Sequence, residues 1–156
     1  MKSISVRYRA VIAFMVIFLI SMTAGAFCGD SVLLVTAEEA AQPSIRAAGE
    51  EKNDGPVISI HSPENDATLS GTFRLYIEVE KKEDGADVLM DSLKVRYLKV
   101  VPIDITDRVR DYISGTSLDV PNAEFPAGNH RTEIYIEDAE GYASSKVFHV
   151  EVVEAE

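Results

Sequence analysis

Hydrophobic and polar residues alternate with a period of two in several short runs between Pro56 and Val153. Such alternation is typical of β-strands that bury one face and expose the other. Clusters rich in Gly, Pro, Asn and Asp separate the runs and indicate turns. The pattern predicts strands at residues 57–60, 73–79, 92–101, 103–105, 117–120, 130–137 and 146–153.

One stretch of this region has a helical pattern. Residues 106–113 place Val109 and Ile113 one turn apart, with Thr106 as the expected N-cap and Gly115 after the end. Because no helices alternate with the strands, the pattern favours an all-β sandwich of about seven antiparallel strands with one short helical turn. The buried strand faces predict a core of Phe73, Leu75, Ile77, Val79, Leu93, Val95, Ile134, Ile136, Phe148, Val150 and Val152.

The beginning of the chain has the features of a targeting segment. Lys2, Arg7 and Arg9 give a basic start, and residues 10–29 contain no charge. An Ala-x-Ala motif ends at Ala26. A basic start, an apolar run and such a motif predict a secretory signal peptide, cleaved after Ala26. The basic flank is expected to stay in the cytoplasm while the remainder is exported.

Three alternatives concern the same segment. A second candidate cleavage site follows Ala37. Residues 10–29 are also near the ~20 residues that span a bilayer, so an uncleaved anchor helix is an alternative. Lipidation of Cys28 is the third, although Phe27 and Gly25 depart from the small residue and the Leu of a bacterial lipobox.

The chain is accordingly divided into three parts. Residues 1–26 are the predicted signal peptide or anchor helix, residues 27–55 a flexible linker, and residues 56–156 the sandwich domain. The linker is rich in Ala, Glu, Asp and Gly and has no sustained hydrophobic period. A short helix at residues 37–41 would have no partner face.

Several motifs in the third part are similar to those of bacterial immunoglobulin-like (Ig-like) modules of exported and cell-surface proteins. Four pieces carry the resemblance: residues 56–63 followed by 69–71, residues 91–95, residues 103–106, and Phe125-Pro126-x-Gly128-x-His130 followed by Asp138-x-x-Gly141. The resemblance implies an Ig-like β-sandwich with a spacer, adhesion or assembly role, and it implies no reaction. Asn65-Asp66 and Tyr142 depart from the family pattern, and the chain has no internal repeat.

Charge narrows the classes of partner. The net charge is −11, and residues 56–156 contribute most of it, with 10 basic and 20 acidic residues. This balance argues against nucleic acid, since its binders offset phosphate charge with Lys and Arg. A single Cys excludes an internal disulfide and a cysteine-based zinc cluster.

Three groups of residues are candidate sites. Within the resemblance, His130 with Gly128 is expected to form a structural corner, in which the ring bonds a nearby backbone group as in a tyrosine corner. Tyr76 and Tyr135 lie on the polar faces of their strands and could form an exposed binding surface or pack against Tyr112.

Acidic residues form the third group. Glu137, Asp138 and Glu140 are candidates for a weak calcium site at a loop end, although no acidic cluster has EF-hand spacing. The simpler interpretation is solvated charges that protect strand edges. No other metal or cofactor is expected.

The sequence contains no glycine-rich phosphate loop, catalytic triad pattern or G-x-S-x-G motif. The expectation is therefore a non-catalytic extracytoplasmic Ig-like module that binds or positions an exported or surface protein. It would be periplasmic or extracellular and would contact the membrane only through an uncleaved N-terminal helix. The alternative is a carbohydrate-binding accessory module for a polysaccharide.

Overall fold

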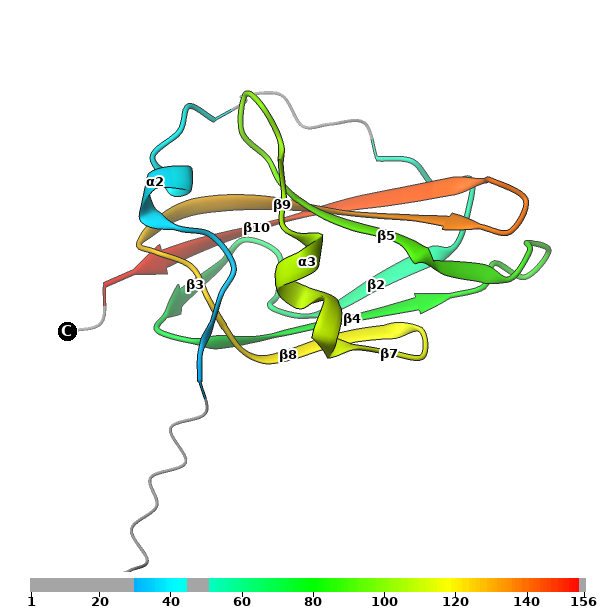
Figure 1. Cartoon of the computed structure of the whole chain (residues 1–156), viewed down its shortest axis with the longest axis horizontal. Helices are drawn as coiled ribbons and strands as arrows, with labels where there is room; N and C mark the ends of the chain where they lie inside the picture. The colour runs from blue at the N-terminus through cyan, green and yellow to red at the C-terminus, as the bar shows by residue number, and fades with distance from the viewer. Residues whose placement is uncertain (1–29, 45–50, 155–156) are drawn as a thin grey trace, which may run out of the picture.

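The computed structural model describes residues 30–44 and 51–154 of the 156-residue chain. They form two sheets packed face to face, with short helical segments between some of the strands (Figure 1). The predicted all-β sandwich is therefore confirmed. The elements in chain order are β1 (Val32–Leu33), α2 (Ala37–Ala40), β2 (Val57–Ser62), β3 (Ala67–Ser70), β4 (Phe73–Glu80), β5 (Val88–Tyr97), β6 (Ile103–Asp104), α3 (Thr106–Val109), η1 (Arg110–Tyr112), β7 (Ile113–Ser114), β8 (Ser117–Glu124), β9 (Gly128–Asp138) and β10 (Ala143–Val153).

Sheet A has the strand order β1-β8-β4-β2, with β7 also paired to β8. Sheet B has the order β3-β10-β9-β5-β6. Most pairs are antiparallel, but β1 runs parallel to β8 and β3 runs parallel to β10. In Figure 1 sheet B lies above sheet A, and α3 lies in front of the space between them.

The core lies between the sheets and contains all eleven residues that the strand pattern predicted. It also contains residues outside that predicted list, among them Tyr97, Leu118 and Phe125, each at most 2% exposed. Residues 106–112 form α3 and η1, so the predicted helical patch is confirmed except for Ile113, which begins β7; Val109 is fully buried.

The expected N-cap of α3 is wrong in detail. Ile105, and not Thr106, holds the N-cap position, and its side chain makes no capping hydrogen bond to the helix. Instead, the Asp104 carboxylate accepts hydrogen bonds from the Thr106 backbone N–H at 2.9 Å and from the Thr106 hydroxyl at 2.5 Å. The Thr106 hydroxyl oxygen in turn accepts the Val95 N–H, so Thr106 connects α3 to β5.

The N-terminal segment (residues 30–44) is not the flexible linker that its composition predicted. Strand β1 pairs with β8, and Leu34 and Val35 are fully buried in the core. Helix α2 also has a partner face, because Ala40 packs against the core cluster. Burial of apolar side chains offsets the entropy lost by ordering this segment, which local composition does not reveal.

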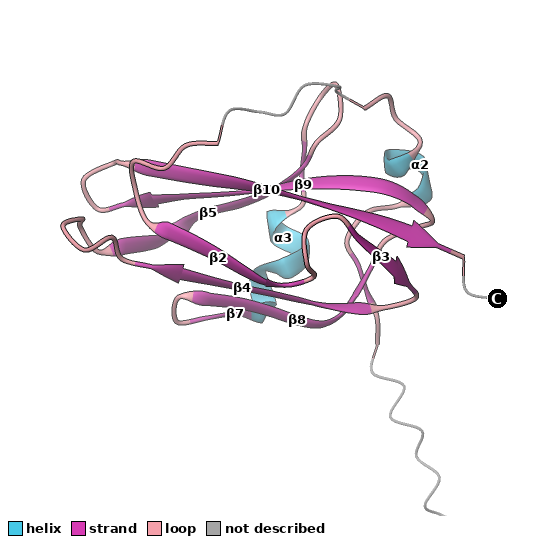
Figure 2. Cartoon of the chain, turned by 180° about the vertical axis from the view of Figure 1, so that it is seen from behind, coloured by secondary structure: helices cyan, strands magenta, loops and turns pink. Residues whose placement is uncertain are grey.

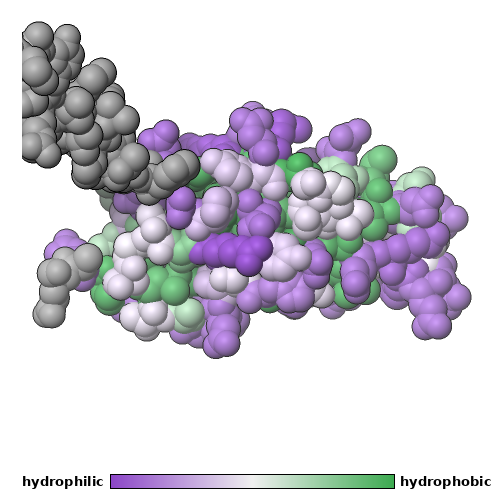
Figure 3. All heavy atoms as spheres, turned by 90° about the horizontal axis from the view of Figure 1, so that it is seen from below, coloured by the Kyte–Doolittle hydropathy of each residue, from purple (hydrophilic) through white to green (hydrophobic). Residues whose placement is uncertain are grey.

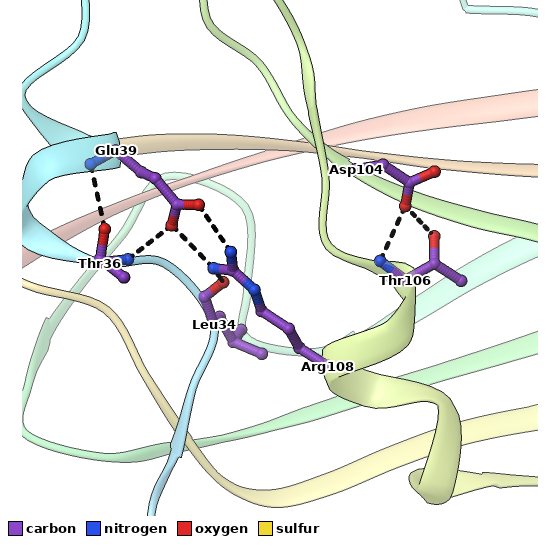
Figure 4. A network of polar contacts seen from close by, with 6 residues as sticks. All are labelled: Leu34, Thr36, Glu39, Asp104, Thr106 and Arg108. Atoms are coloured by element: carbon purple, nitrogen blue, oxygen red, sulfur yellow. Dashed lines mark hydrogen bonds and ion pairs between the residues drawn. The ribbon is translucent and has the colours of Figure 1, made fainter.

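Two cations from other parts of the chain hold this segment, and Figure 4 shows one of them, Arg108. Arg108 forms a bidentate pair with Glu39, at 2.6 and 2.8 Å, and also donates to the Leu34 carbonyl at 2.7 Å. Buried Lys99 donates to the Ala40 carbonyl at 2.6 Å. The Arg108 hydrogen bonds lower the Glu39 pKa to about 2, so this carboxylate stays charged at neutral pH.

Residues 1–29, which include the predicted signal peptide and Cys28, lie outside the described residues. Among the described helices, none is long and apolar enough to cross a bilayer.

On the face that carries β7 and β8, purple hydrophilic residues are interspersed with green hydrophobic ones (Figure 3).

Candidate functional site at the open edge of strand β2

Strand β2 has an unpaired edge in the described structure, since β4 is its only ladder partner there. On β4, Val79 donates its N–H to Thr116 on the side away from β2, and Val79 lies opposite Ile58. Val79 and Ile58 are therefore a non-hydrogen-bonded pair of the antiparallel ladder. In such a pair, each residue directs its backbone N–H and C=O away from the other strand. Ile60 lies opposite Ile77 in the same phase. Ile58 and Ile60 therefore direct their backbone polar groups to the open edge.

Two hollows lie along this edge, between β2 and β10. The first, about 300 Å³, is lined by residues from 51–58, by Lys82 and by residues 144–146. The second, about 250 Å³, reaches Pro63 and Asn65. Lys146 and Glu51 line both hollows, so we treat them together as the edge groove. Figure 2 shows β2 and β10 from this side of the sandwich.

Two ammonium groups line the first hollow. Lys82 donates to the Asn53 carbonyl and Lys146 donates to the Ile58 carbonyl, each at 3.2 Å. Neither forms an ion pair with a described carboxylate, in contrast to Arg74, Arg96 and Arg108. The hollow thus has two ammonium groups that no described ion pair neutralises, on a strongly acidic protein.

The Ser144 hydroxyl adds a hydrogen-bonding group to the same hollow. Ser144 lines the hollow, is only 2% exposed, and its Oγ has no hydrogen-bond partner in the described structure. A buried hydroxyl without a partner is costly, and most such groups in native proteins are satisfied. The Ser144 hydroxyl is therefore an unsatisfied polar group in the wall of the hollow, with its oxygen closed to solvent.

The segment before β2 closes one end of the groove. Gly55 donates to the Ala143 carbonyl, and Ser145 donates to the Lys52 carbonyl. A Cβ on Gly55 would lie 2.3 Å from the Tyr142 carbonyl oxygen, so this close approach requires glycine. The N-terminal half of β10 is therefore covered, and β2 remains the open edge.

The arrangement suits a strand-like ligand. Unpaired backbone groups can form main-chain hydrogen bonds with an extended peptide, and adjacent hollows can take its alternate side chains. The Ser144 hydroxyl makes no hydrogen bond to any described basic group, so no described residue activates it as a nucleophile.

His130 and Gly128 lie at the start of β9, away from the edge groove. His130 is 2% exposed, and its Nε2 lies 2.7 Å from the Pro126 carbonyl. Its Nδ1 lies 3.0 Å from the Tyr97 hydroxyl, and its ring stacks on Phe125 at 4.6 Å. Desolvation lowers the pKa of this imidazole, and burial likewise raises the pKa of Tyr97 to about 12.

Tyr76 and Tyr135 do not form one surface. Tyr76 is on β4 of sheet A and Tyr135 is on β9 of sheet B, with both rings on outer faces. The guanidinium carbon of Arg74 lies over the Tyr76 ring, 4.6 Å from the ring centroid, and the Tyr76 ring also stacks with His61. The side chains alternate across each strand, so these two tyrosines point to opposite sides of the sandwich.

Two of the three candidate calcium ligands, Asp138 and Glu137, have other side-chain contacts. The Asp138 carboxylate is 3% exposed and accepts the backbone N–H groups of Glu140 and Tyr142, which shapes the β9–β10 hairpin. Glu137 accepts the Tyr135 hydroxyl. Within the described residues, no three His, Cys, Asp or Glu side chains are grouped closely enough to hold a metal ion.

Sequence patterns missed the edge groove because its residues come from separate parts of the chain. Lys82 lies in a charged turn, Ser144 follows a hairpin, and Lys146 alternates on a strand as any solvated lysine would. The available signal was weak: Lys146 occupies the apolar phase of β10, two residues before Phe148. An apolar phase that ends in a lysine indicates a sheet edge that the facing sheet does not cover.

No family model matches the chain, and no curated protein matches it either. Among solved structures, the chain is similar to an endo-β-1,4-mannanase from Thermotoga petrophila, with 13% identity and a TM-score of 0.44 over 70% of this chain. It spans only 21% of that enzyme.

Two smaller proteins are similar at comparable distance. CopC from Methylosinus trichosporium OB3b is 14% identical with a TM-score of 0.41, over 67% of this chain and 97% of CopC. PcoC, a methionine-rich copper resistance protein from Escherichia coli, is 12% identical with a TM-score of 0.41, over 64% of this chain and 99% of PcoC. All three likenesses are too distant to indicate a family or a function.

Proposed function

We propose that this protein is a non-catalytic, extracytoplasmic Ig-like module that binds or positions a protein partner. In this proposal, an extended segment of the partner adds to sheet A along β2. The observation that carries it is the edge groove, where the outward N–H and C=O groups of Ile58 and Ile60 border two hollows. Strand addition uses main-chain hydrogen bonds for affinity and side-chain hollows for specificity.

Two features of the edge bear on the strand that it can accept. Ile58 is only 7% exposed, so water has little access to it and hydrogen bonds of its backbone groups are less weakened by water. The β2 edge is also bulged between Ile60 and Ser62, which limits the open ladder to its first half. A short partner segment is therefore favoured.

Export is supported by the sequence of the first 29 residues, which has the basic start and uncharged run of a targeting segment. The sandwich that follows them contains no cysteine. Oxidation of a thiol in an oxidising compartment therefore cannot disturb the fold of the sandwich.

The carbohydrate-binding alternative has less support. Stacking of a sugar needs a free aromatic face, and the Tyr76 ring is already contacted by Arg74 and His61. Tyr135 is contacted by Arg96, 5.4 Å from its centroid. Separation of the two tyrosines onto opposite faces leaves no joint platform.

A peptide-binding experiment tests the proposal. The probes are fluorescent octapeptides of alternating Val and Thr that differ at one central position, which is Glu, Gln or Lys. We expect at least one probe to bind and to slow hydrogen exchange of the Ile58 and Ile60 amides, measured by NMR. Ile60→Pro removes the outward N–H of residue 60, which makes no ladder hydrogen bond to β4. The substitution should therefore weaken peptide binding about tenfold or more.

The matched control is Ile60→Ala, which shortens the same side chain and keeps the N–H. It should retain most of the affinity. If Ile60→Pro is folded and binds as well as Ile60→Ala, strand addition at β2 is wrong. Failure of every probe to protect the Ile58 and Ile60 amides in the unmodified protein would also contradict the proposal, whatever the stability of the variants.

A further inference from the structure

We infer that the edge groove selects a partner segment with an acidic side chain, whose carboxylate binds Lys82, Lys146 and Ser144 in the first hollow. The inference rests on the proposed strand addition and gives the chemistry of the partner. The ligand class is an extended peptide with a Glu or Asp beside the β2 edge.

Charge is the first argument. Lys82 and Lys146 approach the hollow from different elements, a turn after β4 and strand β10. Each ammonium has only a backbone carbonyl as its described partner. A carboxylate forms stronger, charge-assisted hydrogen bonds with an ammonium than a neutral carbonyl does. A carboxylate that enters the hollow therefore improves on both existing contacts.

The buried hydroxyl of Ser144 is an independent argument. Its oxygen lacks a partner in the described structure although the residue is 98% buried, given its exposed fraction of 2%. A hydroxyl can donate one hydrogen bond to an acceptor. A carboxylate is an acceptor with two oxygens, so it can satisfy Ser144 and an ammonium together.

Glu51 limits the total charge of the ligand. It lines both hollows, and its Oε1 accepts the Val147 N–H at 3.2 Å. Two lysines and one glutamate leave a net charge of about +1 for the groove at neutral pH. This balance fits a single carboxylate better than a polyanion, which would meet Glu51 at close range.

The position of Lys146 links selection to opening of the edge. Its ammonium occupies the Ile58 carbonyl, which is an acceptor that an added strand needs. In the free protein this contact protects the edge from unwanted pairing, a common use of lysine at sheet edges. When the partner carboxylate binds the Lys146 ammonium, the Ile58 carbonyl loses this donor and can accept a hydrogen bond from a backbone N–H of the partner. An acidic segment therefore binds and also exposes its own hydrogen-bond acceptor.

The Glu, Gln and Lys octapeptides test this inference. We expect the Glu probe to bind about tenfold or more tightly than the isosteric Gln probe and the Lys probe to bind most weakly, with a preference that falls as salt is added. Lys146→Gln should reduce the affinity for the Glu probe to that for the Gln probe. Ser144→Ala should weaken the Glu probe about threefold to tenfold and weaken the Gln probe less, because an amide oxygen is a weaker acceptor than a carboxylate.

The matched control is Lys94→Gln, which removes a lysine beside Tyr135 on the outer face of sheet B. It should leave the Glu-to-Gln preference unchanged. If Lys94→Gln and Lys146→Gln reduce the preference equally, the effect is general electrostatics and the inference is wrong. If the Glu and Gln probes bind equally and both protect the Ile58 and Ile60 amides, the carboxylate site is wrong while strand addition stands.

A third result separates the two proposals in the other direction. If the Glu probe is preferred, and Lys146→Gln abolishes that preference without any protection of the Ile58 and Ile60 amides, the lysines bind the carboxylate but the peptide does not extend β2. That outcome overturns the proposed function and leaves only an anion site.

Discussion

At the residue scale, His130 illustrates how a buried polar side chain is satisfied. The Pro126 carbonyl can only accept, so Nε2 of His130 carries the hydrogen of this contact. Nδ1 of the neutral ring then accepts the Tyr97 hydroxyl. Stacking on Phe125 completes the environment. Burial lowers the pKa of His130 against the opposing effect of the Pro126 hydrogen bond, and nearby Lys99 lowers it further.

This environment predicts a pH dependence of stability. The folded-state pKa lies below the ordinary value of 6.5, so at intermediate pH the unfolded chain binds a proton that the folded protein excludes. The free energy of unfolding should therefore fall as pH is lowered from about 6.5 through the folded-state pKa. Urea unfolding at a series of pH values between about 7.5 and 5.5 measures this slope.

The variant His130→Gln identifies the source of the slope. It should lose about 1–3 kcal/mol at neutral pH, from imperfect replacement of the buried hydrogen bonds, and its unfolding energy should vary less with pH. His61→Gln is the control, because His61 lies on the exposed face of β2 and pairs with Glu78. An unchanged slope in His130→Gln would show that other groups cause the pH dependence.

At the element scale, the N-terminal segment (residues 30–44) completes the sandwich. It adds a parallel strand to sheet A and places two apolar side chains in the core. Glu39 and Thr36 form a capping box at the start of α2, and the same Glu39 pairs with Arg108 of α3. One short helix is thus tied to the other, although neither has enough residues to be stable alone.

Leu34 and Leu33 provide a direct comparison. Leu34 is fully buried and its neighbour Leu33 is 49% exposed. We expect Leu34→Ala to reduce the free energy of unfolding by about 2–5 kcal/mol, because it removes core volume and leaves a cavity. Leu33→Ala should change it by about 0.5 kcal/mol or less. Equal effects of the two substitutions in denaturant titrations would mean that the segment does not pack on the sandwich.

At the scale of the whole molecule, the position of the N-terminal segment bears on export. The uncharged run ends at Gly29, and β1 begins at Val32. Cleavage after Ala26 leaves β1, Leu34 and α2 in the mature protein. Cleavage after Ala37 would remove β1 and both buried residues and would leave the core with a large cavity.

We therefore expect the mature protein to begin at Phe27, as measured by mass spectrometry of the exported form. The physical reason is that only this cleavage keeps Leu34 and Val35 in the folded domain. A mature N-terminus at Glu38 would contradict this expectation. Recovery of the intact chain, with Met1, in the membrane fraction would support the anchor alternative instead.

The sequence by itself determined the class of fold and about half of the buried core. Alternation with a period of two depends only on neighbouring residues, so β4, β9 and β10 were predicted with their buried faces. The one helical patch was placed correctly for the same reason. The Asp138 turn and the His130 loop were also marked locally, by Gly141 and by Pro126.

Only the tertiary structure decided which segments complete the sandwich and where it remains open. Residues 30–44 have a composition typical of a linker, but a distant strand and Arg108 supply their partners. The edge groove likewise depends on which strand lies at the border of sheet A and on which side chains of β10 face it. These contacts join residues that lie 29 to 93 positions apart in sequence, and local periodicity carries no information about such pairings.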